Sequence, residues 1–549
     1  MAQKTQKTPS QLRRASPAHR GAPTVSDRTR SRLSGDLAAT AHDLEALIAI
    51  DVGTSGARAV AFDLDGHRLL EVRRGYPIQT PQQGWAEQDA RLWRSAALEA
   101  LGTVILRLRA GPDWRGRVQI RAIGLTGQCP SVVPVDRTGE PLSPGLMYRD
   151  NRATAEAHEL REQFGDERIH NLTGHLPAAF HVLPKMMWFR RYRPRIWAAD
   201  PIFLQPRDLV ALALTGEKAT DGTHAAGTLI YDLRKQNWSA EIMSGLDLDL
   251  RLLPEIRPSG EILGELRTPL VRRFGLNGSV PVILGGADSQ VCALGAGVVV
   301  PGPVSEMAGS STCLNSAIVE PLDEPLISHY PHVVPGLYTT ETGINTTGAA
   351  VGWLADLLYG GRAGRAGSSD YLVLNAEAAQ VSRGSQGVLA LPVLGDGERT
   401  DPDLRAAFVG VSSRHGRGVL VRAMLEGVAF AIRGQLELLH GAGVPVTELR
   451  VSGGDARLAT WNRIKAEVTG VPVRTTQGDA AATGVAMLAG LGAGIYRDVD
   501  EAIARCVRLD PVIDPEPTAC ETYEGVYGAY KELVGSAVVR RQPVQDAGR

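Results

Sequence analysis

The residues best suited to chemistry lie in a hydroxyl-rich turn within residues 47–63, LIAIDVGTSGARAVAFD. Apolar runs stand on both sides of this turn, which is the pattern of a β-hairpin. The glycine at Gly53 lets backbone N–H groups approach an anion, and the hydroxyls of Thr54 and Ser55 supply further hydrogen bonds. The segment therefore predicts a phosphate-binding hairpin, with an ordinary glycine-rich hairpin as the alternative.

Two charged residues flank the same turn. Asp51 ends the first expected strand, where its carboxylate can orient the water shell of a Mg²⁺ ion that neutralises phosphates. Arg58 follows the turn and can either bind phosphate or remain a solvated charge. We expect Asp51 to act on the metal through water.

A second turn of the same kind occurs at residues 304–316, VSEMAGSSTCLNS. Its small and hydroxyl-bearing residues are Gly309, Ser310, Ser311 and Thr312, again between strand-like flanks. Two such hairpins predict two homologous halves that close on one nucleotide.

Length and composition fit this arrangement. A chain of 549 residues is too long for one core and indicates two domains. Its 59 basic and 60 acidic residues balance, so neither a nucleic-acid partner nor a membrane surface is expected. The five cysteines lack metal-site or disulfide spacing, and no apolar run reaches the roughly 18 residues of a membrane span. We expect a cytoplasmic protein.

The two ends differ from the rest of the chain. Residues 1–45 are rich in Arg, Ser, Thr and Pro and poor in large apolar side chains, which favours a disordered tail over a transit peptide. Residues 536–549 are expected to form a C-terminal tail.

Between the hairpins, strands and helices alternate. Asp89 is a candidate N-cap for a helix over residues 90–106, whose apolar residues recur at helical spacing. Residues 121–127 form an expected buried strand that delivers Gln128 to a loop at its end, where α/β proteins place ligands.

A series of motifs then follows in order. They comprise GWAEQD at 84–89, TGQ at 126–128, LPKMMWF at 183–189, the run 203–232, GGADSQ at 285–290, LPVLGDGERT at 391–400, and the runs 408–430 and 451–470. Together they resemble the FGGY family of carbohydrate kinases over about residues 46–500. The resemblance implies an α/β fold of two actin-like (ribonuclease H-like) domains around an interdomain cleft. The expected N-terminal domain spans residues 46–290 and the C-terminal domain residues 291–535.

The resemblance also implies a reaction, the transfer of the ATP γ-phosphoryl group to a sugar or polyol hydroxyl with Mg²⁺ present. Asp288 is the candidate catalytic base, because it follows the apolar run 282–284 and two glycines that leave room for both reactants. A carboxylate with a pKa of about 3.9 is a weak base. It can still align the hydroxyl and accept its proton late in the transfer.

The remaining site residues follow from the same resemblance. The turn Gly453-Gly454-Asp455, after an expected strand and before an expected helix, is assigned to the nucleoside. The sugar pocket is assigned to Trp85, Gln128, Cys129, Asp150, Arg152, Asp288 and Gln290. Xylulose-type members usually carry Gln-Met-His-Gly where this chain has Gln-Cys-Pro-Ser from residue 128, and a Trp where it has Tyr148. These departures change the shape and polarity of the pocket, so the identity of the sugar is not fixed by the resemblance.

Several functions remain open at this point. The first is a kinase for a ketopentose such as xylulose. The alternative is a kinase of the same family that acts on a polyol (glycerol, erythritol) or an aldonate (gluconate). An actin-like ATPase or chaperone would need no sugar pocket, and a silent sugar-binding regulator would need neither Asp51 nor Asp288. The resemblance also allows a homodimer.

Overall fold

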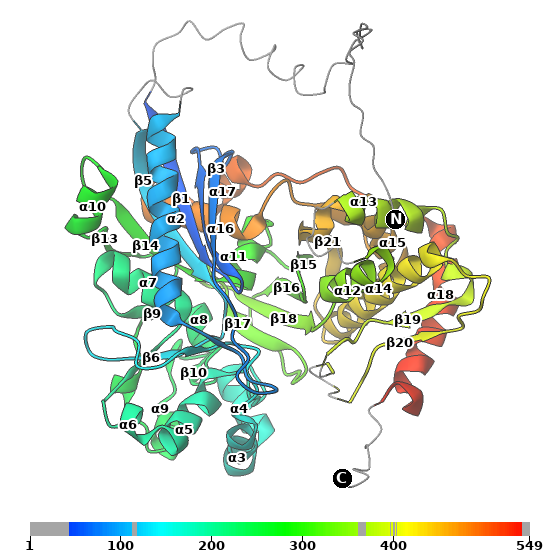
Figure 1. Cartoon of the computed structure of the whole chain (residues 1–549), viewed down its shortest axis with the longest axis horizontal. Helices are drawn as coiled ribbons and strands as arrows, with labels where there is room; N and C mark the ends of the chain where they lie inside the picture. The colour runs from blue at the N-terminus through cyan, green and yellow to red at the C-terminus, as the bar shows by residue number, and fades with distance from the viewer. Residues whose placement is uncertain are drawn as a thin grey trace, which may run out of the picture.

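The computed structural model describes residues 43–111, 118–360, 369–395, 397–398, 401 and 403–540 (Figure 1). Most of the expected N-terminal tail and the last nine residues of the expected C-terminal tail lie outside this part of the chain. Strand β1 (Leu44–Val52) includes residues 44 and 45, the last two of the expected N-terminal tail. The described start of the C-terminal tail holds a 3₁₀ turn, Ala537–Val539.

The first half is built on a six-stranded sheet in the order β13-β14-β5-β1-β2-β3. β1 pairs antiparallel with β2 and parallel with β5, and β5 pairs parallel with β14. Helices cover both faces of this sheet, so β1 and β5 are almost continuously apolar. The further strands are β2 (Gly56–Phe62), β3 (Arg68–Gly75), β5 (Val118–Gly127), β13 (Ile262–Glu265) and β14 (Pro281–Ala287).

The second half repeats this plan in the order β17-β18-β16-β15-β21-β22. β15 pairs antiparallel with β16 and parallel with β21, and β21 pairs parallel with β22. The two predicted hairpins, β1–β2 and β15–β16, therefore occupy equivalent places, which confirms two similar halves. The strands are β15 (Gly302–Ala308), β16 (Thr312–Ile318), β17 (Ser328–Pro331), β18 (Tyr338–Ile344), β21 (Val446–Gly453) and β22 (Val473–Thr475).

Two helices, α11 (Asp288–Gly295) and α16 (Ala480–Gly492), lie between the sheets (Figure 1). They cross in backbone contact, since a Cβ at Gly484 would lie 1.9 Å from the Val291 carbonyl oxygen. Their apolar side chains share one buried cluster with Leu47 of the first sheet and Ala317 of the second. The small side chains of α16 thus let it pack closely against α11.

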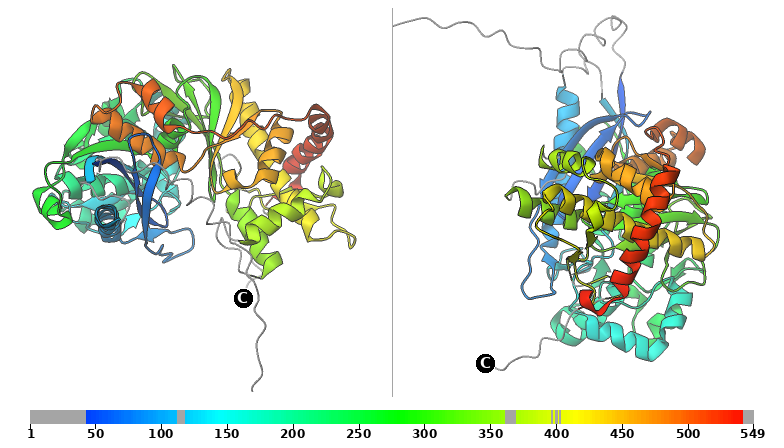
Figure 2. Two further views of the ribbon diagram at one scale, coloured as in Figure 1. Left: turned by 90° about the horizontal axis from the view of Figure 1, so that it is seen from above. Right: turned by 90° about the vertical axis from the view of Figure 1, so that its right-hand side faces the viewer.

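The outer layers differ between the halves. Helices α2 (Ala90–Ala110) and α7 (Pro206–Thr215) pack on the first sheet, and α14 (Arg417–Gly441) and α15 (Ala459–Thr469) pack on the second. The Asp89 carboxylate accepts a 3.0 Å hydrogen bond from the N–H of Arg91, as expected of an N-cap. Helix α18 (Pro517–Gly535) lies on the outer side of the second half (Figure 2).

Smaller elements complete both halves. The short paired strands are β4 (Glu87–Gln88), β6 (Val133–Val135), β7 (Gly145–Leu146), β8 (Ile202–Leu204), β9 (Ala219–Asp221), β10 (Tyr231–Asp232), β11 (Asn237–Trp238), β12 (Glu255–Arg257), β19 (Leu389–Leu391) and β20 (Ala407–Val409). The other helices are α3 (Thr154–Phe164), α4 (Asp166–Thr173), α5 (Val182–Tyr192), α6 (Pro194–Trp197), α8 (Gly222–Ala226), α9 (Ala240–Gly245), α10 (Thr268–Phe274), α12 (Gly348–Tyr359), α13 (Ser369–Ala379) and α17 (Val499–Cys506). None of the helices in the described ranges is both long and apolar enough to cross a bilayer.

Candidate functional site

Three strands of the first sheet end side by side. Val52 at the end of β1 and Ala287 at the end of β14 both pair with Gly127 at the end of β5. The residues that follow these strands therefore meet at one edge of the sheet. They are the Gly53 turn, Gln128 and Asp288, which were predicted separately.

Asp288 is the first residue of α11 and is half-buried. Its Oδ1 accepts a 3.0 Å hydrogen bond from the N–H of Ser289. Burial, followed by the nearby Asp51 carboxylate, raises the pKa of Asp288 to about 8, and Glu341 adds to the rise. A carboxylate with a pKa near neutrality is a suitable proton acceptor.

The glycines before Asp288 also have a structural cause in the packing of β14. Gly285 has a φ of +75°, and a Cβ at this position would lie 1.6 Å from the carbonyl oxygen of Leu125. A side chain at Gly286 would meet Val333 at 2.6 Å. The pair thus lets β14 approach β5 and Val333 of the second half.

The first hairpin turn is held by three side chains around it. The Tyr76 hydroxyl donates to the Gly53 carbonyl at 2.6 Å, and Gln88 Nε2 donates to the Thr54 carbonyl at 2.7 Å. Gln128 Nε2 also reaches the Gly53 carbonyl at 3.4 Å. Thr54 stays half-buried and Ser55 exposed at the tip. The turn is therefore fixed while its tip faces outward.

Arg58 is engaged by two carboxylates. Its Nε donates to Asp51 Oδ2 at 2.7 Å, and its Nη1 contacts Asp479 Oδ2, on the residue that caps α16. Burial alone would lower the pKa of the Arg58 guanidinium, but Asp51 and Asp479 together raise it. The sequence gives no sign of this contact, because Asp479 is 421 residues from Arg58.

Asp51 fits the expected role toward Mg²⁺. Its Oδ2 is held by Arg58, and within the described residues its buried Oδ1 has no hydrogen-bond partner. Mg²⁺ usually retains several waters and takes one or two protein carboxylates, so this oxygen suits a water-mediated contact. The described part of the chain contains no cluster of three or more His, Cys, Asp or Glu that would coordinate a metal by itself.

The second hairpin turn rests on the start of α12. The Ser310 carbonyl accepts hydrogen bonds from the N–H groups of Thr347 and Ala349, each at 3.0 Å. The Thr312 and Thr347 hydroxyls lie 2.9 Å apart. Gly309 and Ser310 are exposed at the tip. This turn is thus braced from below, as the first one is.

The predicted nucleoside turn lies beside this second hairpin. Gly453 pairs with Ala308, and its φ is +94°. A Cβ there would lie 2.1 Å from the Ala308 carbonyl oxygen. A 3₁₀ turn, Asp455–Arg457, precedes α15, so the helix starts at Ala459, later than expected. The side chain of Asp455 lies outside the described part.

On the sugar side, Asp150 and Arg152 form a buried pair. Arg152 Nε and Nη2 donate to the two oxygens of Asp150, each at 2.8 Å, and Arg152 Nη2 also contacts Glu87 at 2.7 Å. The Ala86 N–H donates to Asp150 Oδ2 at 2.6 Å. The ring of Trp85 stacks on Arg152, with the guanidinium 3.6 Å from the ring centroid. These contacts tie the segment with Trp85 to the segment with Asp150.

The other predicted sugar residues face inward. Gln128 is bonded to Gln88, and Gln290 is bonded to Thr339 and lies 3.3 Å from Glu341. Burial, with the charge of Asp288, raises the pKa of the Cys129 thiol well above its usual value. In this structure Gln128 and Gln290 thus brace the surroundings of Asp288.

Two further residues of this region were not predicted. Glu341 Oε2 accepts a 2.7 Å hydrogen bond from the Ser289 hydroxyl, which links β18 to α11. Lys185 Nζ donates to the carbonyls of Met147 at 2.8 Å and Phe180 at 2.7 Å. Burial lowers the pKa of Lys185 to about 7, partly offset by Asp150. The only local signal for Lys185 was the LPKMMWF motif.

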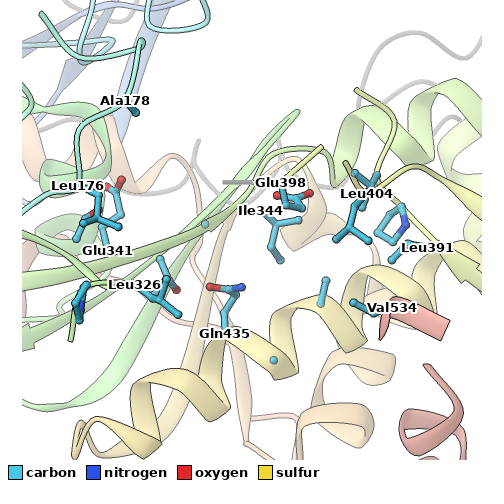
Figure 3. A pocket seen from close by; sticks show the side chains of 18 of the residues that line it. Leu176, Ala178, Leu326, Glu341, Ile344, Leu391, Glu398, Leu404, Gln435 and Val534 are labelled. Carbon is cyan, nitrogen blue, oxygen red and sulfur yellow. The ribbon is translucent and has the colours of Figure 1, made fainter. Parts of the chain in front are cut away.

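A cavity of about 350 Å³ lies between the two halves (Figure 3). Leu176, Ala178 and His181 of the first half line it, together with Glu341 and Gln435 of the second. Figure 3 shows Glu341 beside Leu176 at one end of the cavity, and Leu391 and Leu404 at the other. Within the described part of the chain, none of the site residues predicted from the sequence lines this cavity, so it lies apart from the predicted phosphate and sugar positions.

Two similar halves, each with a braced hydroxyl-rich hairpin turn at the equivalent place, define an actin-like phosphotransferase. Comparisons with known proteins make the class specific. Residues 46–295 match the N-terminal domain of the FGGY family of carbohydrate kinases, and residues 305–493 match its C-terminal domain. The chain belongs to this family and is an ATP-dependent carbohydrate kinase.

The relatives agree with this assignment. The chain is 28% identical over 500 residues to a xylulose kinase of Lactococcus lactis, covering 89% of this chain and 96% of the relative. It is 29% identical over 520 residues to an autoinducer-2 kinase of Yersinia enterocolitica, covering 90% and 96%. Among solved structures, a xylulose kinase of Rhodospirillum rubrum is similar with a TM-score of 0.79 at 30% identity, covering 89% and 98%.

Proposed function

We propose that the protein transfers the γ-phosphoryl group of Mg·ATP to a hydroxyl of a ketopentose of the xylulose type, with Asp288 as the catalytic base. The observation that carries this proposal is the position of Asp288 where β14 ends beside the first hairpin turn, with a pKa raised to about 8. Phosphoryl transfer requires mainly positioning and charge stabilisation, plus one group that receives the hydroxyl proton. Asp288 meets that last requirement.

The phosphate groups are assigned to the two hairpin turns. The hydroxyls assigned to them are those of Thr54 and Ser55 in the first turn and of Ser311 and Thr312 in the second. Of these, Thr312 is buried and its hydroxyl is bonded to Thr347. Mg²⁺, when bound, supplies charge neutralisation at the phosphates. Asp51 orients the water shell of the ion through Oδ1, the oxygen that Arg58 does not contact.

The sugar is assigned to the first half and the adenosine to the second. Asp150 and Arg152 hold the wall that carries Trp85, and Lys185 bonds two carbonyls of the same region. Gly453 ends β21 beside the second hairpin and Gly454 follows it, and the absence of a side chain at Gly454 leaves room for a ribose or base.

The ketopentose is favoured by the xylulose kinases among the relatives of this chain. A relative named for a different substrate, the autoinducer-2 kinase, has a sequence identity to this chain similar to that of the xylulose kinase. Polyols and aldonates therefore stay as the alternative acceptors within the family. An ATPase or chaperone without a sugar substrate is disfavoured by the paired Asp150 and Arg152.

The proposal is tested by ADP release measured across a panel of pentuloses, polyols and aldonates at fixed Mg·ATP. We expect the highest kcat/KM with a ketopentose, and little ADP release without an acceptor. A polyol or an aldonate with a higher kcat/KM would overturn the substrate. ATP hydrolysis that no acceptor stimulates would overturn the kinase reaction itself.

A further inference from the structure

The strand that leads to Asp288 is irregular at Leu284 and Gly285, and its last two residues, Gly286 and Ala287, pair with β5 again. β14 pairs regularly with β5 as far as Ile283, and the register then shifts between Ile283 and Gly286. Irregularities of this kind re-aim side chains and occur beside active sites. Buried backbone groups that lose ladder partners need other partners.

Side chains of the first half provide several of these partners. Arg207 Nη1 donates to the Leu284 carbonyl at 2.7 Å, and Thr126 Oγ1 donates to the Gly286 carbonyl at 2.7 Å. The N–H of Ala287 donates to Thr223 Oγ1, also at 2.7 Å. Ala287 directly precedes Asp288, so Thr223 holds the Gly286–Ala287 peptide, one peptide before the one that leads into Asp288.

Thr223 is itself fixed by a buried acid. Its hydroxyl donates to Asp221 Oδ2 at 2.6 Å, and Ser259 Oγ donates to the same oxygen at 2.9 Å. Arg207 Nη2 binds the other oxygen of Asp221 at 2.6 Å. Thr223 is only 1% exposed, and Asp221 and Arg207 are fully buried. Water therefore does not compete for the hydrogen bonds among these three residues.

The burial of this set separates it from the reactants. Asp221 and Thr223 stand behind the end of β14, and the Thr223 hydroxyl is occupied on both sides, as acceptor from Ala287 and as donor to Asp221. A group placed in this way acts through the backbone it holds. Its effect should therefore fall on the chemical step more than on the binding of ATP.

We propose that Thr223, fixed by Asp221, is a positioning residue that aims the Asp288 carboxylate at the acceptor hydroxyl. The inference rests on the proposed role of Asp288 as base. It gives a function to residues 203–232, which the sequence analysis singled out without a chemical role. Displacement of a reacting group by about 1 Å can cost about 10²-fold in rate, so a single hydrogen bond at this point is sufficient.

The test compares two buried threonines of the same segment. Thr223→Val keeps the shape and removes the hydroxyl, which frees the N–H of Ala287. The matched control is Thr228→Val. Thr228 is 4% exposed, and its hydroxyl likewise accepts from a backbone N–H, of Ile230, and donates to a carbonyl, of Ala225. Both variants should lose some Tm, since each loses a buried hydroxyl.

The kinetic readout distinguishes positioning from packing. We expect Thr223→Val to lower kcat by about 10- to 100-fold, with the KM for ATP within about twofold of the parent. Thr223→Ser should restore kcat to within about threefold, and Thr228→Val should keep the parent kcat. Equal kcat values for the two valine variants would overturn the proposal.

Two further variants keep the test decisive. If Thr223→Val does not fold, Ser259→Ala removes one of the bonds that hold Asp221, and a few-fold loss of kcat is expected. An unchanged kcat of that variant would count against positioning. In an Asp288→Asn background, Thr223→Val should cause no further loss. If Asp288→Asn alone keeps the parent kcat, the assignment of the base has failed, whereas a normal kcat in Thr223→Val beside an inactive Asp288→Asn refutes the positioning role alone.

Discussion

Arg58 Nε donates a 2.7 Å hydrogen bond to Asp51 Oδ2, while the other end of the same guanidinium contacts Asp479. The side chain of Arg58 is only 15% exposed. Arg58 is therefore bound to two carboxylates and is not a solvated charge, whereas its contact with phosphate stays a prediction. It also ties the first hairpin to the helix between the two sheets.

We expect Arg58→Gln to reduce stability and ATP affinity together. Loss of the guanidinium leaves two partly buried carboxylates without their cation, which costs about 1–3 kcal/mol. Urea unfolding and calorimetric titration with ATP measure the two effects. The control is Arg68→Gln, whose ion pair with Glu71 is on the surface and should contribute less than about 1 kcal/mol. Equal stability losses in both variants would contradict a structural role for Arg58.

The pH dependence of stability tests the environment of Asp288. Burial and the Asp51 charge raise the pKa of Asp288 to about 8, against about 3.9 in an unfolded chain. Between these values the native state holds a proton that the unfolded state has lost. The stabilising contribution is therefore full below about pH 4 and is lost as the pH rises through about 8.

Asp288→Asn removes this dependence. The variant should gain stability relative to the parent between pH 5 and pH 9, by a few kcal/mol at most because Asp288 is half-buried. Urea midpoints at several pH values measure the difference. Parallel pH profiles for the two proteins would show that Asp288 has an ordinary pKa.

Asp51→Asn tests the metal contact. The amide keeps a hydrogen-bond acceptor for Arg58 but loses the charge that orients the waters of Mg²⁺. We expect a weaker ATP affinity in the presence of Mg²⁺, by about 10-fold or more, and a smaller effect on ATP binding without the metal. Calorimetry in both conditions checks this without relying on turnover. Equal losses with and without Mg²⁺ would remove Asp51 from the metal site.

Gly285→Ala tests the close approach of β14 to β5. The added Cβ would collide with the Leu125 carbonyl, and the positive φ adds strain of about 1–2 kcal/mol. We expect a large loss of Tm or failure to fold. Gly528→Ala is the control, because no atom lies within 4 Å of its Cβ position and alanine is favoured in α18. A Gly285→Ala protein as stable as this control would contradict the packing.

Short-range patterns predicted much of this site. The two hairpins and the position of Asp288 depend on adjacent residues, and the structure has the hairpins where the glycine and hydroxyl turns predicted them. The repeated strand order was available only through the family resemblance, since strands such as β14 and β5 pair across more than 150 positions.

The residues that were not predicted contact the site from positions far away in the sequence. Asp479 reaches Arg58 from 421 positions away, and Thr223 reaches Ala287 across 64. Neither has a local pattern that distinguishes it from an N-cap or a buried hydroxyl. The two glycines before Asp288 were singled out for the room they leave to the reactants, which stays a prediction. Their packing against β5 was not expected, because the sequence does not show that β5 lies beside them.

Asp288 is proposed to accept the proton of the acceptor hydroxyl. The most direct measurement is single-turnover phosphorylation of the best ketopentose by Asp288→Asn, with ATP binding measured on the same protein. For Asp288→Asn we expect a rate lowered by about 10²- to 10⁴-fold with ATP binding retained. The control Asp323→Asn, at an exposed position, should match the parent. Turnover by Asp288→Asn within a few-fold of the parent would contradict this role of Asp288.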